Sequence, residues 1–87
     1  MANENKKANG WNVDYGYEGC LVKREGSHAV VVYKDLAIEG IRWGIQVFDE
    51  ADERAMAFGR YEYNLFGVWS ESAAIAIGEA YISDNLK

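Results

Sequence analysis

The chain lacks proline altogether and has one cysteine, Cys20, and one histidine, His28, among its 87 residues. A single cysteine forms no internal disulfide and cannot supply a multi-cysteine zinc site, so a disulfide-stapled secreted fold is not indicated. With no proline, the nine glycines are the residues that we expect to make tight turns and bulges. No apolar run approaches the roughly 20 residues of a membrane-spanning helix, and the polar N-terminus lacks the apolar core of a signal peptide. We therefore expect a cytoplasmic protein that makes no contact with membranes.

Positive charge is scarce in the middle of the chain. Between residues 35 and 53, six carboxylates stand against a single cation, Arg42, and this segment accounts for the whole net charge of −5. Domains that bind nucleic acid usually carry a basic surface, whereas this chain has an isoelectric point near 4.7. The charge pattern therefore predicts no direct binding of nucleic acid, and it favours a partner whose surface is basic.

Hydrophobic periodicity predicts several short strands. Four ranges show either a period of two or a short β-branched run: 11–17, 20–33, 41–48 and 55–63. Gly26 is placed to close a hairpin within the second range, and Gly59 is interpreted as a bulge in the last. The charged residues 49–54 are predicted to form a solvated loop between the last two strands, and 64–69 to form a packed connector.

The C-terminal segment carries the one clear helix signal. Ser70 is a favoured N-cap residue, and Glu71 places a carboxylate at the positive end of the helix dipole. Small and apolar residues follow at helical spacing, namely Ala74, Ile77, Gly78, Tyr81 and Ile82. Gly78 costs about 1 kcal/mol relative to Ala in a helix interior, and we expect its missing Cβ to allow a close approach to the sheet.

Together these elements predict an α+β fold. In it, an antiparallel sheet of four to five short strands is covered on one face by a single C-terminal helix at about 71–84. Residues 1–10 are expected to be a disordered polar tail, and 11–87 to be a single small domain.

No motif in the sequence indicates a reaction. The acidic segment does not fit a calcium-binding EF-hand loop, because positions six and twelve would be Arg54 and Arg60 rather than Gly and Glu. Weak cation binding by this segment remains open. His28 is interpreted as a solvated turn residue, with a general base or a metal ligand as the alternative, and the adjacent Ser27 points to the opposite strand face. We therefore predict a protein that is not an enzyme and has no catalytic residues, cofactor or metal site.

The surface composition instead favours binding to another protein. The predicted contact surface combines an acidic edge with an aromatic patch, in which Tyr61 and Tyr63 share one strand face. Aromatic residues and arginine are enriched where interfaces gain most of their binding energy. The predicted contact residues are Asp35, Glu39, Asp49, Glu50, Asp52, Glu53, Arg60, Tyr61 and Tyr63. The expected target is a basic protein surface, such as the nucleic-acid groove of another protein.

In its small size, its acidity and its lack of catalytic groups, the chain resembles the acidic inhibitors that phages and mobile elements direct against host nucleases. These include anti-CRISPR and anti-restriction proteins. The resemblance implies a viral, non-enzymatic inhibitor that blocks a surface of its target. Two alternatives remain open. One is a self-associating homodimer that buries the aromatic face, and the other is a ligand-binding or enzymatic domain with a pocket between sheet and helix.

Overall fold

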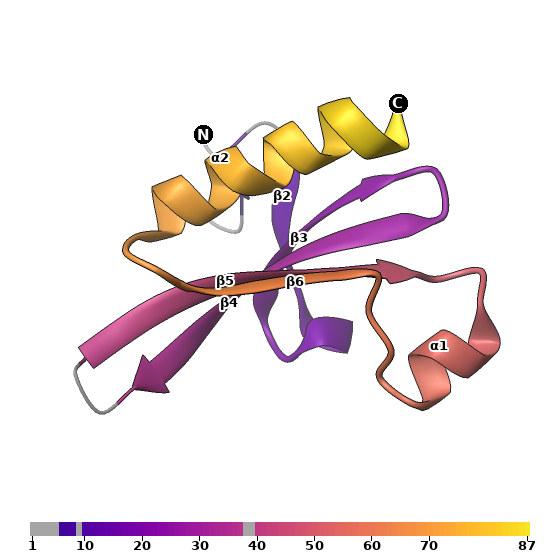
Figure 1. Ribbon diagram of the computed structural model, residues 1–87, viewed down its shortest axis with the longest axis horizontal. Coiled ribbons are helices and arrows are strands. Elements are labelled where there is room, and N and C mark those ends of the chain that lie inside the picture. The colour runs from indigo at the N-terminus through magenta and orange to yellow at the C-terminus, as the bar shows by residue number, and fades with distance from the viewer. Residues whose placement is uncertain (1–5, 9, 38–39) are drawn as a thin grey trace.

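The computed structural model describes residues 6–8, 10–37 and 40–87 (Figure 1). Six strands form one antiparallel sheet in the order of the sequence. The strands are β1 (Lys6–Ala8), β2 (Trp11–Asp14), β3 (Cys20–Glu25), β4 (His28–Ala37), β5 (Gly40–Asp49) and β6 (Tyr63–Val68). Two α-helices follow β5 and β6, namely α1 (Glu53–Ala57) and α2 (Glu71–Tyr81), and α2 continues as a π-helical segment, η2 (Ile82–Leu86). The predicted α+β class with an antiparallel sheet and a C-terminal helix is confirmed.

The N-terminal edge of the sheet departs from the predicted tail. Residues 6–8 form β1, which pairs with β2, while residues 1–5 and 9 lie outside the described part of the chain. The backbone groups of β2 on that side are thereby paired within the sheet, which a free tail would leave unpaired. β2 itself ends at Asp14, whose carboxylate accepts a hydrogen bond from the Gly16 amide and starts a three-residue 3-10 turn, η1 (Tyr15–Tyr17).

The long hairpin of β4 and β5 is the centre of the sheet. Its ten register pairs run from His28 opposite Asp49 to Ala37 opposite Gly40. β3 covers β4 only as far as Val32, and β6 covers β5 only as far as Trp43. The far end of the hairpin therefore extends beyond its neighbours as a two-stranded ribbon, which projects from the sheet in Figure 1.

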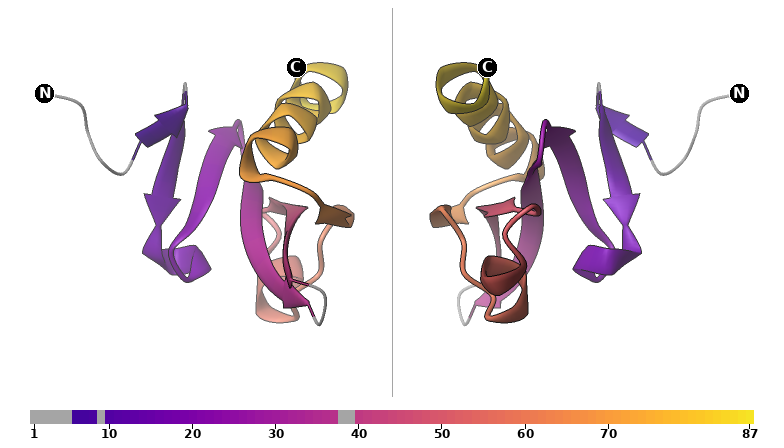
Figure 2. Two further views of the ribbon diagram at one scale, coloured as in Figure 1. Left: turned by 90° about the vertical axis from the view of Figure 1, so that its left-hand side faces the viewer. Right: turned by 90° about the vertical axis from the view of Figure 1, so that its right-hand side faces the viewer.

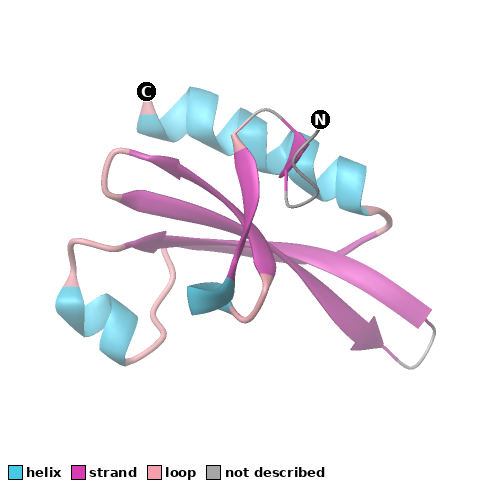
Figure 3. Ribbon diagram, turned by 180° about the vertical axis from the view of Figure 1, so that it is seen from behind, coloured by secondary structure: helices cyan, strands magenta, loops and turns pink. Residues whose placement is uncertain are grey.

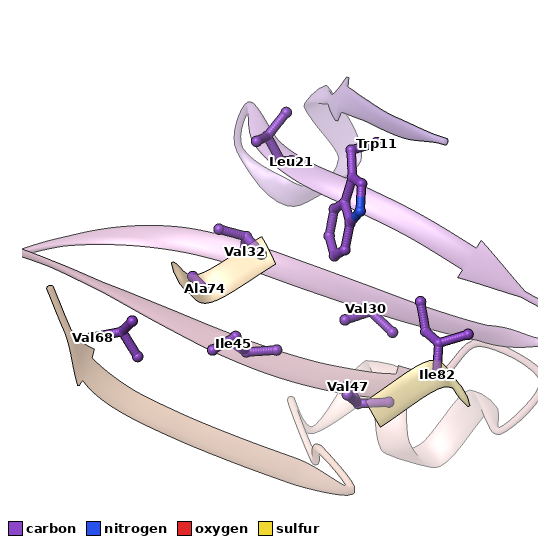
Figure 4. Packing of buried hydrophobic residues seen from close by; sticks show 9 residues of the cluster. All are labelled: Trp11, Leu21, Val30, Val32, Ile45, Val47, Val68, Ala74 and Ile82. Carbon is purple, nitrogen blue, oxygen red and sulfur yellow. The ribbon is translucent and has the colours of Figure 1, made fainter. Parts of the chain in front are cut away.

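Helix α2 covers one face of the sheet (Figure 1), and the main core lies between them (Figure 4). Trp11 and Ile45 are fully buried beneath the helix. A Cβ on Gly78 would lie 2.8 Å from the Trp11 ring, so only glycine lets the helix backbone come this close. The predicted close approach at Gly78 is confirmed. The core residues drawn in the figure are Trp11, Leu21, Val30, Val32, Ile45, Val47, Val68, Ala74 and Ile82.

Helix α1 and the turn η1 lie on the other side of the sheet from α2 (Figures 2 and 3). The prediction of a strand over 55–63 was wrong here, because the segment has both ends of a helix. The Asp52 side chain accepts hydrogen bonds from two amides of the first turn, and Gly59 has the left-handed φ of +66° typical of a helix C-terminus. β6 then occupies most of the range predicted as a connector.

Candidate protein-binding site

The segment between β5 and β6, residues 49–62, forms a projection that we call the α1 lobe. Asp52 caps its helix through hydrogen bonds of 3.0 and 3.2 Å from the amides of Arg54 and Ala55. At the other end, the Gly59 amide donates to the Met56 carbonyl and the Arg60 amide to the Ala55 carbonyl, which is the Schellman pattern of helix termination. Local hydrogen bonds therefore close this short helix, although five residues are too few for a stable helix by themselves.

The outer surface of the α1 lobe carries apolar side chains that the fold does not bury. Ala55 is the one buried residue of α1, whereas the Phe58 side chain is 70% exposed. Met56 and Tyr61 of the same lobe are also exposed. The guanidinium of Arg60 lies 5.4 Å from the centre of the Phe58 ring. These aromatic and arginine side chains have the composition of an interface rather than of a core.

Glu50 anchors the base of the α1 lobe to the rest of the sheet. Both of its carboxylate oxygens accept hydrogen bonds from the Arg24 guanidinium, at 2.8 and 3.0 Å, and Oε2 accepts a third from the Tyr17 hydroxyl at 2.7 Å. The Arg24 guanidinium also pairs with Asp14 at 2.8 Å. The hydrogen bonds from Arg24 hold the pKa of Glu50 below its ordinary value, and burial beside this carboxylate raises the pKa of Tyr17. Glu50 therefore has a structural role and is not free to meet a partner.

An aromatic layer supports the lobe from below. The Phe48 ring lies 5.8 Å from the Tyr17 ring and 6.3 Å from the Tyr61 ring, the latter edge to face. Phe48 and Tyr17 also pack on a second, smaller core formed by Val22, Ala29 and Val31. This face of the sheet is thus partly covered by side chains rather than by a helix.

The predicted acidic residues do not form one continuous edge. Asp52 and Glu53 are exposed at the start of α1, while Asp49 is half-buried and accepts a hydrogen bond from the Ala51 amide. Asp35 is exposed on the projecting ribbon, opposite Arg42. It lies about 23 Å along β4 from the end where Asp49 pairs, at roughly 3.3 Å per residue. Glu39 lies outside the described residues.

The aromatic patch is divided as well. Tyr61 contacts Phe48 on the side of α1, whereas Tyr63 packs against Tyr81 of α2, with ring centres 4.8 Å apart. The two tyrosines therefore do not share one face, because the chain turns between them as it leaves the lobe and enters β6. Arg60 and Tyr61 stay together on the lobe, and Tyr63 belongs to the edge of the main core.

Sequence reasoning missed several exposed apolar residues. The sequence pattern places Met56 and Phe58 on a strand. Asp52 and Gly59 mark the two ends of a short helix, but from the sequence we interpret them as part of a loop and as a bulge. A second group lies on the ribbon, where Leu36 and Ile41 are exposed and are register partners across β4 and β5. Trp69, after the end of β6, is also exposed, and the Arg42 guanidinium lies 4.6 Å from the centre of its ring. We call Leu36 and Ile41 the ribbon-end patch.

A groove of about 730 Å³ opens beside the free edge of β4, next to η1. Tyr17, Tyr33 and Phe48 are among the side chains that line it, together with Cys20. Burial raises the pKa of the Cys20 thiol, which disfavours the reactive thiolate. The lining residues include no histidine, so this groove offers no imidazole base for nucleophilic chemistry.

Comparisons with protein-family models, with curated proteins and with solved structures found no match to the chain. Within the described residues, no helix has the length and apolar character needed to cross a membrane.

Proposed function

We propose that the chain is a non-enzymatic protein-binding module whose α1 lobe contacts a basic surface of its target. One observation carries this proposal: α1 buries only Ala55, and it carries the exposed carboxylates of Asp52 and Glu53 at its N-terminal end and the exposed Phe58 ring at its C-terminal end. A side chain that contributes little to the fold, yet exposes a large ring, is available to another protein.

The aromatic ring and the carboxylates of the α1 lobe are expected to contribute to binding in different ways. Burial of an exposed phenylalanine ring at an interface contributes roughly 1.5–3 kcal/mol, so Phe58 is the expected anchor. Asp52 and Glu53 stand at the rim, where carboxylates mainly accelerate association with a positively charged surface. A nucleic-acid groove on another protein would supply such a surface, and a module bound there would act as an inhibitor, as in the anti-CRISPR and anti-restriction proteins that the chain resembles.

Affinity capture with matched variants tests the proposal. Phe58→Ser should weaken binding of the captured partner by about tenfold or more. The control Tyr15→Ser removes a ring that is 80% exposed elsewhere on the molecule, and it should leave binding unchanged. If both variants bind the partner as the unmodified chain does, the α1 lobe is not the contact surface.

The role of charge is tested separately. Asp52→Asn with Glu53→Gln removes two charges but keeps a side chain that can cap α1, so the fold should be preserved. The association rate and its dependence on salt should both fall, whereas dissociation should change little. If neither the substitutions nor the salt concentration changes the association rate, the partner surface is not basic.

A second candidate is self-association through the ribbon-end patch. Leu36 is 77% exposed and Ile41 is 49% exposed, at the end of the sheet where β3 does not pair with β4 beyond Val32. Exposed apolar groups beside a free strand edge favour pairing with a second copy. Sedimentation measurements should then show a dimer that Leu36→Lys dissociates and Phe58→Ser does not; a monomer at all concentrations would exclude this candidate.

A further inference from the structure

Three potential metal ligands meet at the base of the α1 lobe. The side chains of His28, Asp49 and Glu62 each place one donor atom within 4.8 Å of the other two. The His28 Nε2 atom lies 3.1 Å from Glu62 Oε1. The three residues come from the start of β4, the end of β5 and the residue before β6, so only the folded sheet brings them together.

Backbone pairing fixes this arrangement. His28 and Asp49 are register partners at the end of the central hairpin, and the Glu50 amide donates to the Ser27 carbonyl at 2.8 Å beside them. The Glu62 amide donates to the Val47 carbonyl at 2.7 Å, which returns the chain to β5 next to the pair. These hydrogen bonds fix the backbone of all three residues, so binding of an ion requires rotation of side chains and no change in the fold.

The cluster of His28, Asp49 and Glu62 has more negative than positive charge. Two carboxylates converge on one imidazole, and across residues 6–8, 10–37 and 40–87 neither Asp49 nor Glu62 forms an ion pair with a lysine or arginine. Neighbouring carboxylates repel each other unless a cation lies between them. This distinguishes them from Glu50 on the same lobe, which the Arg24 guanidinium neutralises.

The donor set selects the kind of cation. One imidazole nitrogen with two carboxylate oxygens suits a borderline divalent ion such as Zn²⁺, whereas Ca²⁺ requires six or more oxygen ligands. Two ligands bound to one Zn²⁺ at about 2.0–2.1 Å lie roughly 3.4 Å apart. His28 Nε2 and Glu62 Oε1 are 3.1 Å apart, and within a cluster that spans 4.8 Å a side chain must move inward by about 1 Å for all three to bind one ion.

We propose that His28, Asp49 and Glu62 form a binding site for a divalent first-row transition metal of the Zn²⁺ type. The His28 Nε2 atom and one oxygen of each carboxylate are the protein ligands, and water completes the coordination. Asp49 Oδ1 accepts a hydrogen bond from the Ala51 amide, which orients this carboxylate. Since Asp49 begins the α1 lobe and Glu62 ends it, the ion fastens both ends of the lobe to β4.

Titration of the chelator-treated full chain with Zn²⁺, followed by calorimetry, tests the site. We expect saturable binding of one ion per chain. His28→Ala should reduce the affinity by at least 10- to 100-fold, and Glu62→Gln should also weaken it. The matched control Glu53→Gln removes an exposed carboxylate of the same lobe and should bind as tightly as the unmodified chain. Circular dichroism without metal checks that each variant is folded.

Two further measurements separate this site from others. Co²⁺ bound to the chain should show no thiolate charge-transfer absorption, and Cys20→Ser should leave its spectrum unchanged. In the unmodified chain, Zn²⁺ should shift the amide resonances of residues around His28, Asp49 and Glu62 first. Absence of saturable binding, binding that all ligand variants retain, or shifts confined to the N-terminus or Cys20 would overturn the proposal.

Discussion

The two faces of the sheet are covered by different kinds of contact. On one face, α2 encloses an apolar core around Trp11, whose indole N–H donates to Glu79 at 2.8 Å. On the other face, a small core of three residues lies beneath the rings of Tyr17 and Phe48 and the Arg24–Glu50 ion pair, and α1 extends past it. The first face is closed by burial and therefore supports the fold, whereas the second leaves large side chains such as Phe58 exposed.

The largest expected effect lies on the α2 face. Trp11→Ala removes a fully buried ring and the hydrogen bond to Glu79, so we expect a loss of about 3–5 kcal/mol in the free energy of unfolding. Urea denaturation followed by circular dichroism measures this loss. Tyr15→Ala, at an exposed ring, should change the value by less than about 0.5 kcal/mol. Equal losses for the two variants would contradict the burial of Trp11.

The corresponding change on the opposite face should cost less. Phe48 is only half-buried, so Phe48→Ala should lower the free energy of unfolding by roughly 2 kcal/mol, less than Trp11→Ala. The same denaturation experiment measures it. A loss as large as that of Trp11→Ala would show that the two faces contribute equally to stability, and the contrast between them would fail.

Gly78 tests how tightly α2 packs on its face. Leucine is the better helix former, but its Cβ would overlap the Trp11 ring, so Gly78→Leu should destabilise the protein by about 1–3 kcal/mol. Ala76→Leu, at an exposed position of the same helix, is the matched control and should be nearly neutral. Thermal unfolding of both variants would reveal the difference, and a more stable Gly78→Leu protein would contradict the close contact.

The smallest effect concerns pH. The Lys23 ammonium, together with the Trp11 indole N–H, holds the pKa of Glu79 below its ordinary value of 4.5. Because the folded pKa is lowered, its contribution to stability is complete above pH 4.5 and is lost as the pH falls through the folded value. Glu79→Gln should therefore flatten the decline in unfolding midpoint below pH 4.5. Glu53→Gln should leave that decline intact, and an unchanged decline in Glu79→Gln would contradict the lowered pKa.

The local signals in the sequence were sufficient for α2 and for most of the sheet. Ser70 does cap α2, since its hydroxyl accepts from the Ala73 amide at 3.1 Å, and Gly78 does lie where a close contact requires it. The segment 55–63 was misassigned because a short helix has too few turns to show a period, and its end signals at Asp52 and Gly59 also fit a turn and a bulge. The predicted function remains a proposal.

Composition and periodicity by themselves determined the acidity of this protein, its class of fold and the position of its C-terminal helix, because these depend on neighbours within a few residues. Only the tertiary structure decided which carboxylates are available. Arg24, distant in sequence, neutralises Glu50, while strand pairing brings His28 beside Asp49 and Glu62. Such contacts depend on register between strands, which the order of residues along one strand does not specify.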